Sequence, residues 1–288
     1  MKKVGFVSLG CPKNLVDSEV MMGTLAASGY EITSDASEAD TVVVNTCGFI
    51  ESAKQESIDA ILEATRWKQN GEATRVIVAG CLVERYRDDL MKELPEVDAF
   101  IGTSQVGDIL KAADEEFDAT QLTITPIGNK SSTYLYDEYT PRMRATNAHT
   151  AFIKIAEGCD RPCAFCSIPG MRGSFRSRRF GSIIEEARQL ANDGVRELVL
   201  IAQDSSRYGE DLGEVRPAPH RRAEHPGQDI LVDHQASLPR VSVDVAPCCS
   251  SATRRPGSAT PPRESGESHG NAHHPGATVG APWLGSVP

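Results

Sequence analysis

Short runs of β-branched residues alternate with helix-length stretches over the first 113 residues of this chain, and this alternation limits its possible folds more than any other feature. The β-α-β-α order is typical of an open parallel sheet covered by helices. The predicted fold class is therefore α/β. Strands are expected at 3–9, 41–45, 75–80 and 98–102, and helices at 15–28, 51–68, 82–93 and 104–113.

The alternation stops near residue 113 and resumes in a second unit. The first domain is expected at 1–113, and the polar, turn-rich stretch that follows predicts a linker at 114–148. A second unit is expected at 149–213, where a strand leads directly into a cysteine-rich loop. Within it, apolar spacing predicts a helix at 181–193 and the next strand at 196–202.

The composition changes abruptly after Leu212. From Glu214 to the end there is no Phe, Tyr or Lys, while eleven of the 17 prolines and six of the seven histidines fall there. Such a stretch buries too little apolar surface to offset its ordering entropy, so we expect residues 214–288 to be disordered. The switch occurs after a strand that should feed another helix. Our hypothesis is an out-of-frame tail, with a natural disordered tail as the alternative.

Charge and hydropathy exclude several classes of protein. A formal net charge of -10 argues against a general nucleic-acid or membrane-surface binder, because such proteins usually present a basic face. The apolar run at the start is shorter than a signal-peptide core, and no stretch is long enough to span a bilayer. We therefore expect a cytoplasmic protein, where clustered thiols bind metal or do chemistry more often than they form disulfides.

Three cysteines in the second unit carry the clearest chemical signal. Cys159, Cys163 and Cys166 form a C-x3-C-x2-C loop, which can ligate three irons of a cubane cluster and leave the fourth iron open. The open iron can hold S-adenosylmethionine (SAM), whose carbon–sulfur bond an electron from the cluster can split into a radical. Structural zinc is the alternative, but it normally takes four protein ligands. The residues expected to help the tight turn are Gly158, Pro162 and Gly170.

Other side chains near this loop are candidate contacts for the cofactor. Phe165 could pack on the adenine of SAM, or it could plug the loop into the core. A basic run follows, which could meet the carboxylate of SAM or an acidic substrate, or could simply be solvated. Its members are Arg172, Arg176, Arg178 and Arg179. Four tail residues are not expected to bind metal, because unordered ligands offer no preformed geometry; they are Cys248, Cys249, His273 and His274.

A second set of three cysteines lies in the first domain. Cys11, Cys47 and Cys81 each follow a predicted strand. In an open parallel sheet the carboxyl ends of the strands lie along one rim, where such folds bind ligands, so these cysteines should converge. They hold a metal cluster or are small buried hydrophobes. The polar residues that could support the same rim are Asn14, Ser18 and Asn45.

Several segments together resemble the RimO family from residue 1 to about 213. They are GFVSLGCPKNLVDSE, VVNTCGFIESAKQESI, VAGCLVERY, EGCDRPCAFCSIPGMRGSFRSR and LIAQDSSRYGEDL. The family methylthiolates an aspartate side chain of small-subunit ribosomal protein twelve. The resemblance implies two 4Fe-4S clusters, an auxiliary one on Cys11, Cys47 and Cys81 and a radical-SAM one on the C-x3-C-x2-C loop. Gln203, Asp204 and Tyr208 match a family segment whose roles here are open.

The resemblance also implies a two-part reaction. One SAM supplies a methyl group to sulfur on the auxiliary cluster, and another yields the 5'-deoxyadenosyl radical. The radical removes a hydrogen from the β-carbon of the target aspartate, and the methylthio group is transferred to that carbon. The implied partners are ribosomal protein twelve as substrate and an electron donor such as flavodoxin or ferredoxin, with no membrane and no direct nucleic-acid recognition.

This sequence departs from the family in its second half. Family members continue the second domain as a partial (β/α) barrel and add a small C-terminal β-domain, whereas here only about two β/α units precede the tail. We therefore expect a chain that is poorly folded beyond about residue 150 and inactive. The alternatives are a methylthiotransferase that acts on tRNA adenosine, and a non-catalytic iron–sulfur module.

Overall fold

The computed structural model describes residues 2–114 and 134–213. The tail at 214–288, with the cysteines and histidines noted in it, and part of the predicted linker therefore lie outside the described residues. All the described residues belong to one compact unit. The finer domain boundaries stay predictions.

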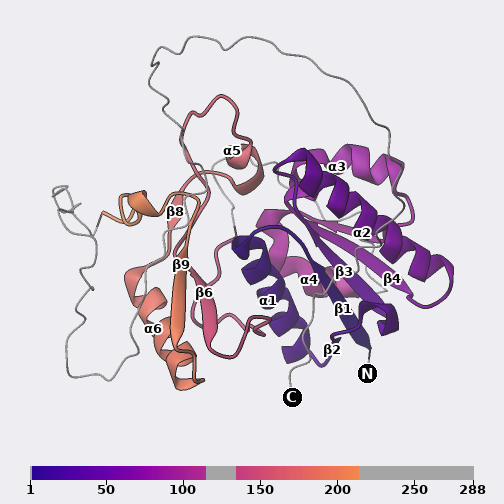
Figure 1. The fold of residues 1–288 in the computed structure, drawn as a ribbon, viewed down its shortest axis with the longest axis horizontal. Coiled ribbons are helices and arrows are strands. Elements are labelled where there is room, and N and C mark those ends of the chain that lie inside the picture. Colours follow the sequence, from indigo (N-terminus) through magenta and orange to yellow (C-terminus); the bar gives the residue numbers. More distant parts are fainter. Residues whose placement is uncertain (1, 115–133, 214–288) are drawn as a thin grey trace, which may run out of the picture. The chain divides into compact units, whose positions relative to one another are not determined.

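An open, five-stranded parallel sheet forms the core of the first part of the chain, as the alternation predicts (Figure 1). Its strands run in the order β2-β1-β3-β4-β5, and all pairs are parallel. The bounds of the strands are Lys3–Ser8 for β1, Glu31–Thr33 for β2, Thr41–Thr46 for β3, Arg75–Gly80 for β4 and Ala99–Ile101 for β5. The sequence pattern missed β2, a three-residue edge strand that is too short to show a period.

Helices cover both faces of the sheet. Their bounds are Pro12–Ala27 for α1, Glu51–Gln69 for α2, Cys81–Glu93 for α3 and Ile109–Ala113 for α4, with 3-10 turns η1 at Ala36–Glu38 and η2 at Thr103–Asp108. Along β3, Val43 points to the core with α1 and α4, while Val42 and Val44 point to the core with α2 and α3. This two-residue alternation explains why β3 is apolar throughout: both of its faces are covered.

The strand order places a topological switch point between β1 and β3, since the chain moves outward from β1 to β2 and then crosses back to β3. Open α/β sheets bind ligands outside the carboxyl ends of the strands at such a point. Cys11 and Cys47 follow β1 and β3, so both lie at this position.

The second part of the described chain begins a further β/α arrangement. Strands β6 (Thr150–Lys154) and β9 (Glu197–Ile201) pair in parallel and are connected through α6 (Phe180–Asn192), as predicted (Figure 1). Short elements lie between them: β7 at Ala156–Glu157, α5 at Ile168–Arg172 and β8 at Arg176–Ser177, with the 3-10 turn η4 at Ser205–Arg207 after β9. The antiparallel β7–β8 pair was not predicted, because two residues per strand leave no pattern.

Residues 150–213 differ from the expectation of poor folding. They enclose an apolar core that includes Ile153, Ile183, Leu190 and Leu198. Buried ion pairs to the first part of the chain, described below, add to this core.

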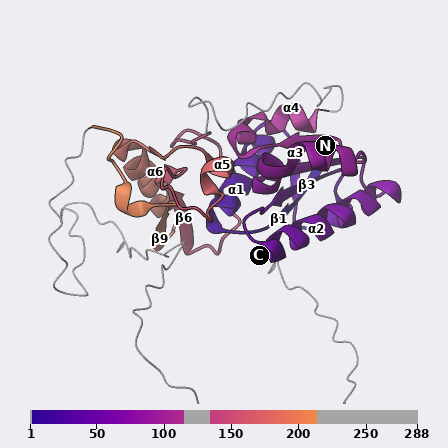
Figure 2. The same ribbon diagram turned by 90° about the horizontal axis from the view of Figure 1, so that it is seen from above.

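Helix α1 connects the two parts. It packs on the sheet through β1 and on β6 on its other side, and it lies between them in both views (Figure 1, Figure 2). Residues 141–142 also lie against it, where a Cβ at Gly23 would come within 2.5 Å of the backbone nitrogen of Arg142. Within the described ranges, no helix has the length and apolar character needed to cross a membrane.

Candidate functional site

The loops of the three N-terminal cysteines meet at the carboxyl edge of the sheet. Gly10 has a φ of +91°, and a Cβ there would lie 2.8 Å from the Cβ of Cys47. Gly48 in turn packs on the start of α3, where its Cβ would lie 3.1 Å from the carbonyl oxygen of Cys81. Gly10 needs to be glycine because of this contact and its positive φ, whereas a Cβ at Gly48 would push the neighbouring backbone away by a few tenths of an ångström. The structure therefore brings the three strand ends together, as parallel topology predicts.

The thiols of this edge differ in burial. Cys11 is exposed, Cys47 is partly exposed and Cys81 is buried. Burial raises the pKa of Cys81 to about 11, although the nearby positive charge of Arg172 lowers it. Burial likewise raises the pKa of Cys47.

Asn14, in the first turn of α1, organises these loops. Its amide nitrogen donates to the carbonyl oxygens of Leu9 at 2.7 Å and Thr46 at 3.2 Å, the residues just before Gly10 and Cys47. Asn45 donates back to the carbonyl oxygen of Asn14 and to the hydroxyl of Ser18, each at 2.8 Å. The three polar residues expected at this rim are thus found there.

The second cysteine loop follows β7. Gly158 has a φ of +79°, and a Cβ there would lie 2.1 Å from the carbonyl oxygen of Ser174, so only glycine fits. The backbone nitrogen of Cys159 donates to the carbonyl oxygen of Gly173 at 3.0 Å, and that of Cys166 donates to Cys163 at 3.1 Å. All three thiols are free, and Cys163 is exposed.

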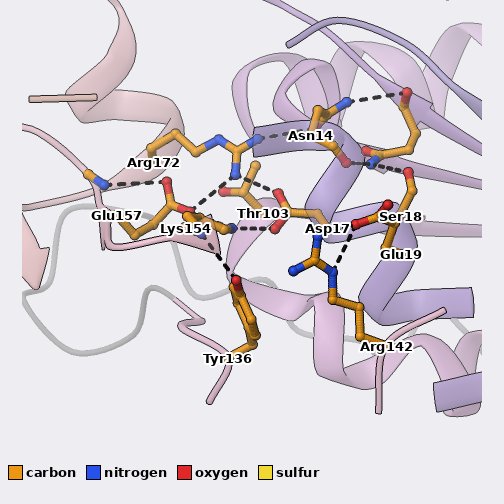
Figure 3. A network of polar contacts seen from close by, with 12 residues as sticks. Asn14, Asp17, Ser18, Glu19, Thr103, Tyr136, Arg142, Lys154, Glu157 and Arg172 are labelled. Carbon is orange, nitrogen blue, oxygen red and sulfur yellow. Dashed lines mark hydrogen bonds and ion pairs between the residues drawn. The ribbon is translucent and has the colours of Figure 1, made fainter. Parts of the chain in front are cut away.

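A network of buried charges joins α1 to the second part of the described chain (Figure 3). Arg172 donates to Asp17 at 2.6 Å and to the side-chain oxygen of Asn14 at 3.1 Å. Lys154 donates to Asp17 at 2.5 Å and to Glu157 at 2.7 Å. All five side chains are buried. The ion pairs join α1 of the first part of the chain to β6, β7 and α5 of the second.

The buried ions hold one another in their charged forms. Burial alone would raise the pKa of Glu157, but the positive charges of Lys154 and Arg172 lower it from 4.5 to about 2. Burial would lower the pKa of Lys154, yet the carboxylates of Asp17 and Glu157 outweigh it and raise that pKa. Buried charges need such partners because isolated ions in a protein interior are costly.

A second buried cluster extends the network along α1. Arg142 donates to Glu19 at 2.8 Å and to Glu186 at 2.7 Å, and Arg178 pairs with Glu186 at 2.5 Å. The hydroxyl of Tyr136 donates to Glu186 at 3.0 Å. Residues of the predicted linker therefore contribute to the packing of both parts of the chain.

Several side chains singled out in the sequence have different surroundings from those expected. Phe165 is 84% exposed, so it does not plug the loop into the core. Gly170 lies in α5 with open space around it and takes no part in the turn. Arg172 and Arg178 are buried on carboxylates of this chain and are not solvated. Arg179 is exposed.

The segment after β9 also contacts the second loop. Gln203 donates to Glu157 at 2.7 Å, and Asp204 accepts from Arg161 of the loop at 2.8 Å. Tyr208 donates to the carbonyl oxygen of Arg178 at 2.9 Å. These three residues thus support the loop and β8.

Metal binding at the two loops stays a prediction. Within residues 2–114 and 134–213, no group of three or more Cys, His, Asp or Glu side chains is close enough to hold a metal ion. The cysteine sets are brought together at the level of their loops and backbone.

Sequence reasoning missed the charged network. Two signals pointed to it: Lys154 stands in the otherwise apolar strand AFIKI, and Asp17 stands between the apolar positions Val16 and Val20 of a helix. A charge among buried positions indicates a paired ion.

The comparisons with known proteins cover most of the described chain. Residues 3–102 match the family described as "Uncharacterized protein family UPF0004". The ribosomal protein uS12 methylthiotransferase RimO of Solibacter usitatus is 56% identical over 73% of this chain and 44% of the relative. The RimO of Koribacter versatilis is 50% identical over 74% of this chain and 50% of the relative, and that of Pelotomaculum thermopropionicum is 52% identical over 73% and 46%.

A solved structure of a radical S-adenosylmethionine methyltransferase, TsrM from Kitasatospora setae, matches with a TM-score of 0.45 and 13% identity, over 69% of this chain and 48% of that one. A similarity at this level says nothing further about fold or function. This chain spans about half the length of the curated relatives that it matches. Over the part that it shares with them, the chain is similar in sequence to these RimO methylthiotransferases.

Proposed function

We propose that this chain is a radical-SAM methylthiotransferase that adds a methylthio group to the β-carbon of an aspartate in small-subunit ribosomal protein twelve. The observation that carries the proposal is the pairing of two cysteine sets: three thiol-bearing loops meet at one sheet edge, and a buried arginine connects that edge to a C-x3-C-x2-C loop. Relatives at least 50% identical to the chain are ribosomal protein uS12 methylthiotransferases, which supports the same type of group transfer.

The donor chemistry of both loops fits iron–sulfur clusters. All six thiols are free, and thiolates are the usual ligands of such clusters. The second loop, with Cys159, Cys163 and Cys166, offers three ligands and would leave one iron for SAM. The first edge would hold the auxiliary cluster on Cys11, Cys47 and Cys81.

Unsatisfied polar atoms beside the second loop fit the polar groups of SAM. Among the described residues, the Nε and Nη2 atoms of Arg176 and the side-chain oxygen of Gln203 are buried and lack hydrogen-bond partners. Both residues flank Glu157, since Arg176 pairs with it across the β7–β8 ladder and Gln203 donates to its carboxylate. Arg176 would take the carboxylate of SAM, and Gln203 would accept from its amino group. Phe165, exposed between two cysteines, would cover the adenine.

When bound, the clusters would supply the electron that cleaves SAM and the sulfur that is transferred. The residues of this chain would hold the clusters and orient SAM. Glu157 fixes Gln203, and the ammonium group of Lys154 keeps that carboxylate ionised. Asn14 and Arg172 would hold the first edge at a fixed position relative to the second loop.

We also propose that the chain acts in the cytoplasm, with a flavodoxin or ferredoxin as electron donor and no direct contact with nucleic acid. The free thiols support a reducing compartment. The net charge of -10 favours a protein substrate over tRNA.

Anaerobic reconstitution tests the proposal. The full chain is expected to bind about eight irons, and each triple Cys→Ala variant, at 11, 47 and 81 or at 159, 163 and 166, is expected to bind about four. With dithionite and SAM, 5'-deoxyadenosine should form unless the second set is removed.

The outcomes separate the candidate functions. Two clusters with SAM cleavage support the enzyme, and one cluster without cleavage supports a non-catalytic iron–sulfur module. Zinc, or no metal, at the second loop would refute the radical mechanism. Mass spectrometry of ribosomal protein twelve and of tRNA after reaction distinguishes the two substrates and tests the expectation that this 288-residue chain is inactive.

A further inference from the structure

Arg172 belongs to the second part of the chain, but its side chain lies at the cysteine edge of the first. It ends helix α5, directly before Gly173, whose carbonyl oxygen accepts from the backbone nitrogen of Cys159. Its side chain is 2% exposed. A guanidinium group is rarely buried to this degree unless it is fully paired.

The partners of Arg172 show where its charge acts. The Nη1 atom donates to Asp17 at 2.6 Å, and Nη2 donates to the side-chain oxygen of Asn14 at 3.1 Å. Asn14 also donates to the carbonyl oxygens just before Gly10 and Cys47. By holding Asn14, Arg172 therefore also holds two of the cysteine loops in place. Helix α5, which Arg172 ends, also packs on α3, whose first residue is the third cysteine, Cys81.

We propose that Arg172 is a positioning residue for the N-terminal cysteine site: it holds the loops of Cys11, Cys47 and Cys81 in register, and its positive charge stabilises the reduced state of a cluster bound there. The inference rests on the proposed function, since it takes these cysteines as cluster ligands. The side chain of Arg172 would then connect the two cysteine sets, both by its hydrogen bonds and by its charge.

Two physical arguments support the electrostatic part. A positive charge and hydrogen bonds to the ligand sulfurs make reduction of an iron–sulfur cluster easier. Arg172 is also 2% exposed and ends α5, which packs on the helix that Cys81 begins, so little solvent screens its charge from that cysteine. The planar, forked guanidinium is required for the mechanical part, because it reaches Asp17 and Asn14 from different nitrogens, which an ammonium group does not do equally well.

The test isolates the first site in the full-length chain. The background carries Cys159→Ala, Cys163→Ala and Cys166→Ala, and is reconstituted anaerobically. Into it are placed Arg172→Met, Arg172→Lys and, as a matched control, Arg178→Met. Arg178 is an equally buried arginine of the same basic run, but it pairs with Glu186 and lies on no cysteine loop.

Two readouts apply, and neither needs turnover. The midpoint potential of the cluster, from a redox titration followed by electron paramagnetic resonance, should fall with Arg172→Met and stay near that of the background with Arg172→Lys and Arg178→Met. Iron loss to a chelator should become at least several-fold faster with Arg172→Met and with Arg172→Lys, because both lose the forked contact, and should not change with Arg178→Met.

A charge-balanced variant guards against misfolding. Asp17→Asn with Arg172→Met removes one anion and one cation together, so no buried charge is left unpaired, and iron loss to the chelator should still be faster than in the background because the contact with Asn14 is lost. If the Arg172 variants match Arg178→Met in both readouts, the inference is wrong while the cluster assignment stands. If the background folds but holds no iron, the proposed auxiliary cluster fails, and the inference fails with it.

Discussion

Lys154 is the last residue of strand β6, and its buried ammonium group forms ion pairs with two carboxylates of the chain. It contacts Asp17 from the first part of the chain and Glu157 from the second, and it is 1% exposed. Removing one member of such a group leaves uncompensated charge in the interior, which costs far more than losing a surface pair.

Lys154→Met should therefore lower the free energy of unfolding by roughly 3–5 kcal/mol, measured by denaturant titration. Lys111→Met is the control, because Lys111 pairs with Asp108 at the surface, and its loss should cost less than about 1 kcal/mol. Equal effects of the two substitutions would show that the buried network adds no stability.

The carboxyl group of Glu84 should make the free energy of unfolding depend on pH in a predictable direction. Burial raises the pKa of Glu84, although hydrogen bonds from Thr103 lower it. The folded chain thus holds this proton more tightly than the unfolded chain does, so the free energy of unfolding should fall as pH rises through 4.5 and above. Glu84→Gln should remove this part of the fall, as judged from unfolding titrations between pH 4 and 7. An unchanged slope would contradict the prediction.

At the scale of elements, Gly23 sets how closely residues 141–142 approach α1. A Cβ at this position would lie 2.5 Å from the backbone nitrogen of Arg142, and backbone cannot easily give way. Gly23→Ala should therefore destabilise the chain by roughly 1–3 kcal/mol, despite the better helix propensity of alanine.

The matched control for Gly23 is Gly181, which lies in α6 with nothing within 4 Å of its Cβ position. Gly181→Ala should stabilise the chain by about 0.5–1 kcal/mol. Thermal unfolding of both variants measures the contrast, and two shifts of the same sign would argue against tight packing at Gly23.

The turn into the second cysteine loop depends on one glycine. Gly158→Ala would place a Cβ 2.1 Å from the carbonyl oxygen of Ser174, at a φ of +79°. Under the proposed function, this variant should lose about four irons per chain on reconstitution. Gly170→Ala is the control, because nothing lies within 4 Å of a Cβ at Gly170. This variant should keep these irons. Full iron content in Gly158→Ala would mean that the loop geometry is not required.

The sequence predicted the main elements because their patterns are long and regular. Strands β1, β3 and β4 lie within one residue of their predicted ends. Helix α1 begins at Pro12, earlier than the predicted 15, because proline fits the first turn of a helix. The predicted helix at 104–113 divides into η2 and α4, which meet after Asp108, and Gln105 within η2 has non-helical dihedral angles. No periodicity could reveal these local departures.

At the scale of the whole molecule, the meeting of the cysteine loops could be predicted and the charged network could not. Parallel topology alone brings the loops of Cys11, Cys47 and Cys81 to one edge. The pairing of Asp17 with Lys154 and Arg172 depends on how two segments more than 130 residues apart pack together, and no local pattern encodes that.

These ion pairs should make the two parts unfold together. Asp17 and Glu19 on α1 form ion pairs with Lys154, Arg172 and Arg142 from the second part. Separating the two parts would leave these buried charges without their partners. We expect a single calorimetric transition for the described residues. The double substitution Asp17→Asn and Glu19→Gln should split it in two, with 134–213 unfolding first. One unchanged transition would assign the coupling to apolar contacts.

The ion pairs between α1 and the second part of the chain also determine how the chain would behave if it were cut into two fragments. If the chain were cut between residues 115 and 133, the N-terminal fragment would expose the acidic pair Asp17 and Glu19. The C-terminal fragment would expose the basic groups that pair with them. Opposite charges steer association and are screened by salt. Co-expressed fragments should therefore reassemble, and raising the ionic strength should slow that complementation.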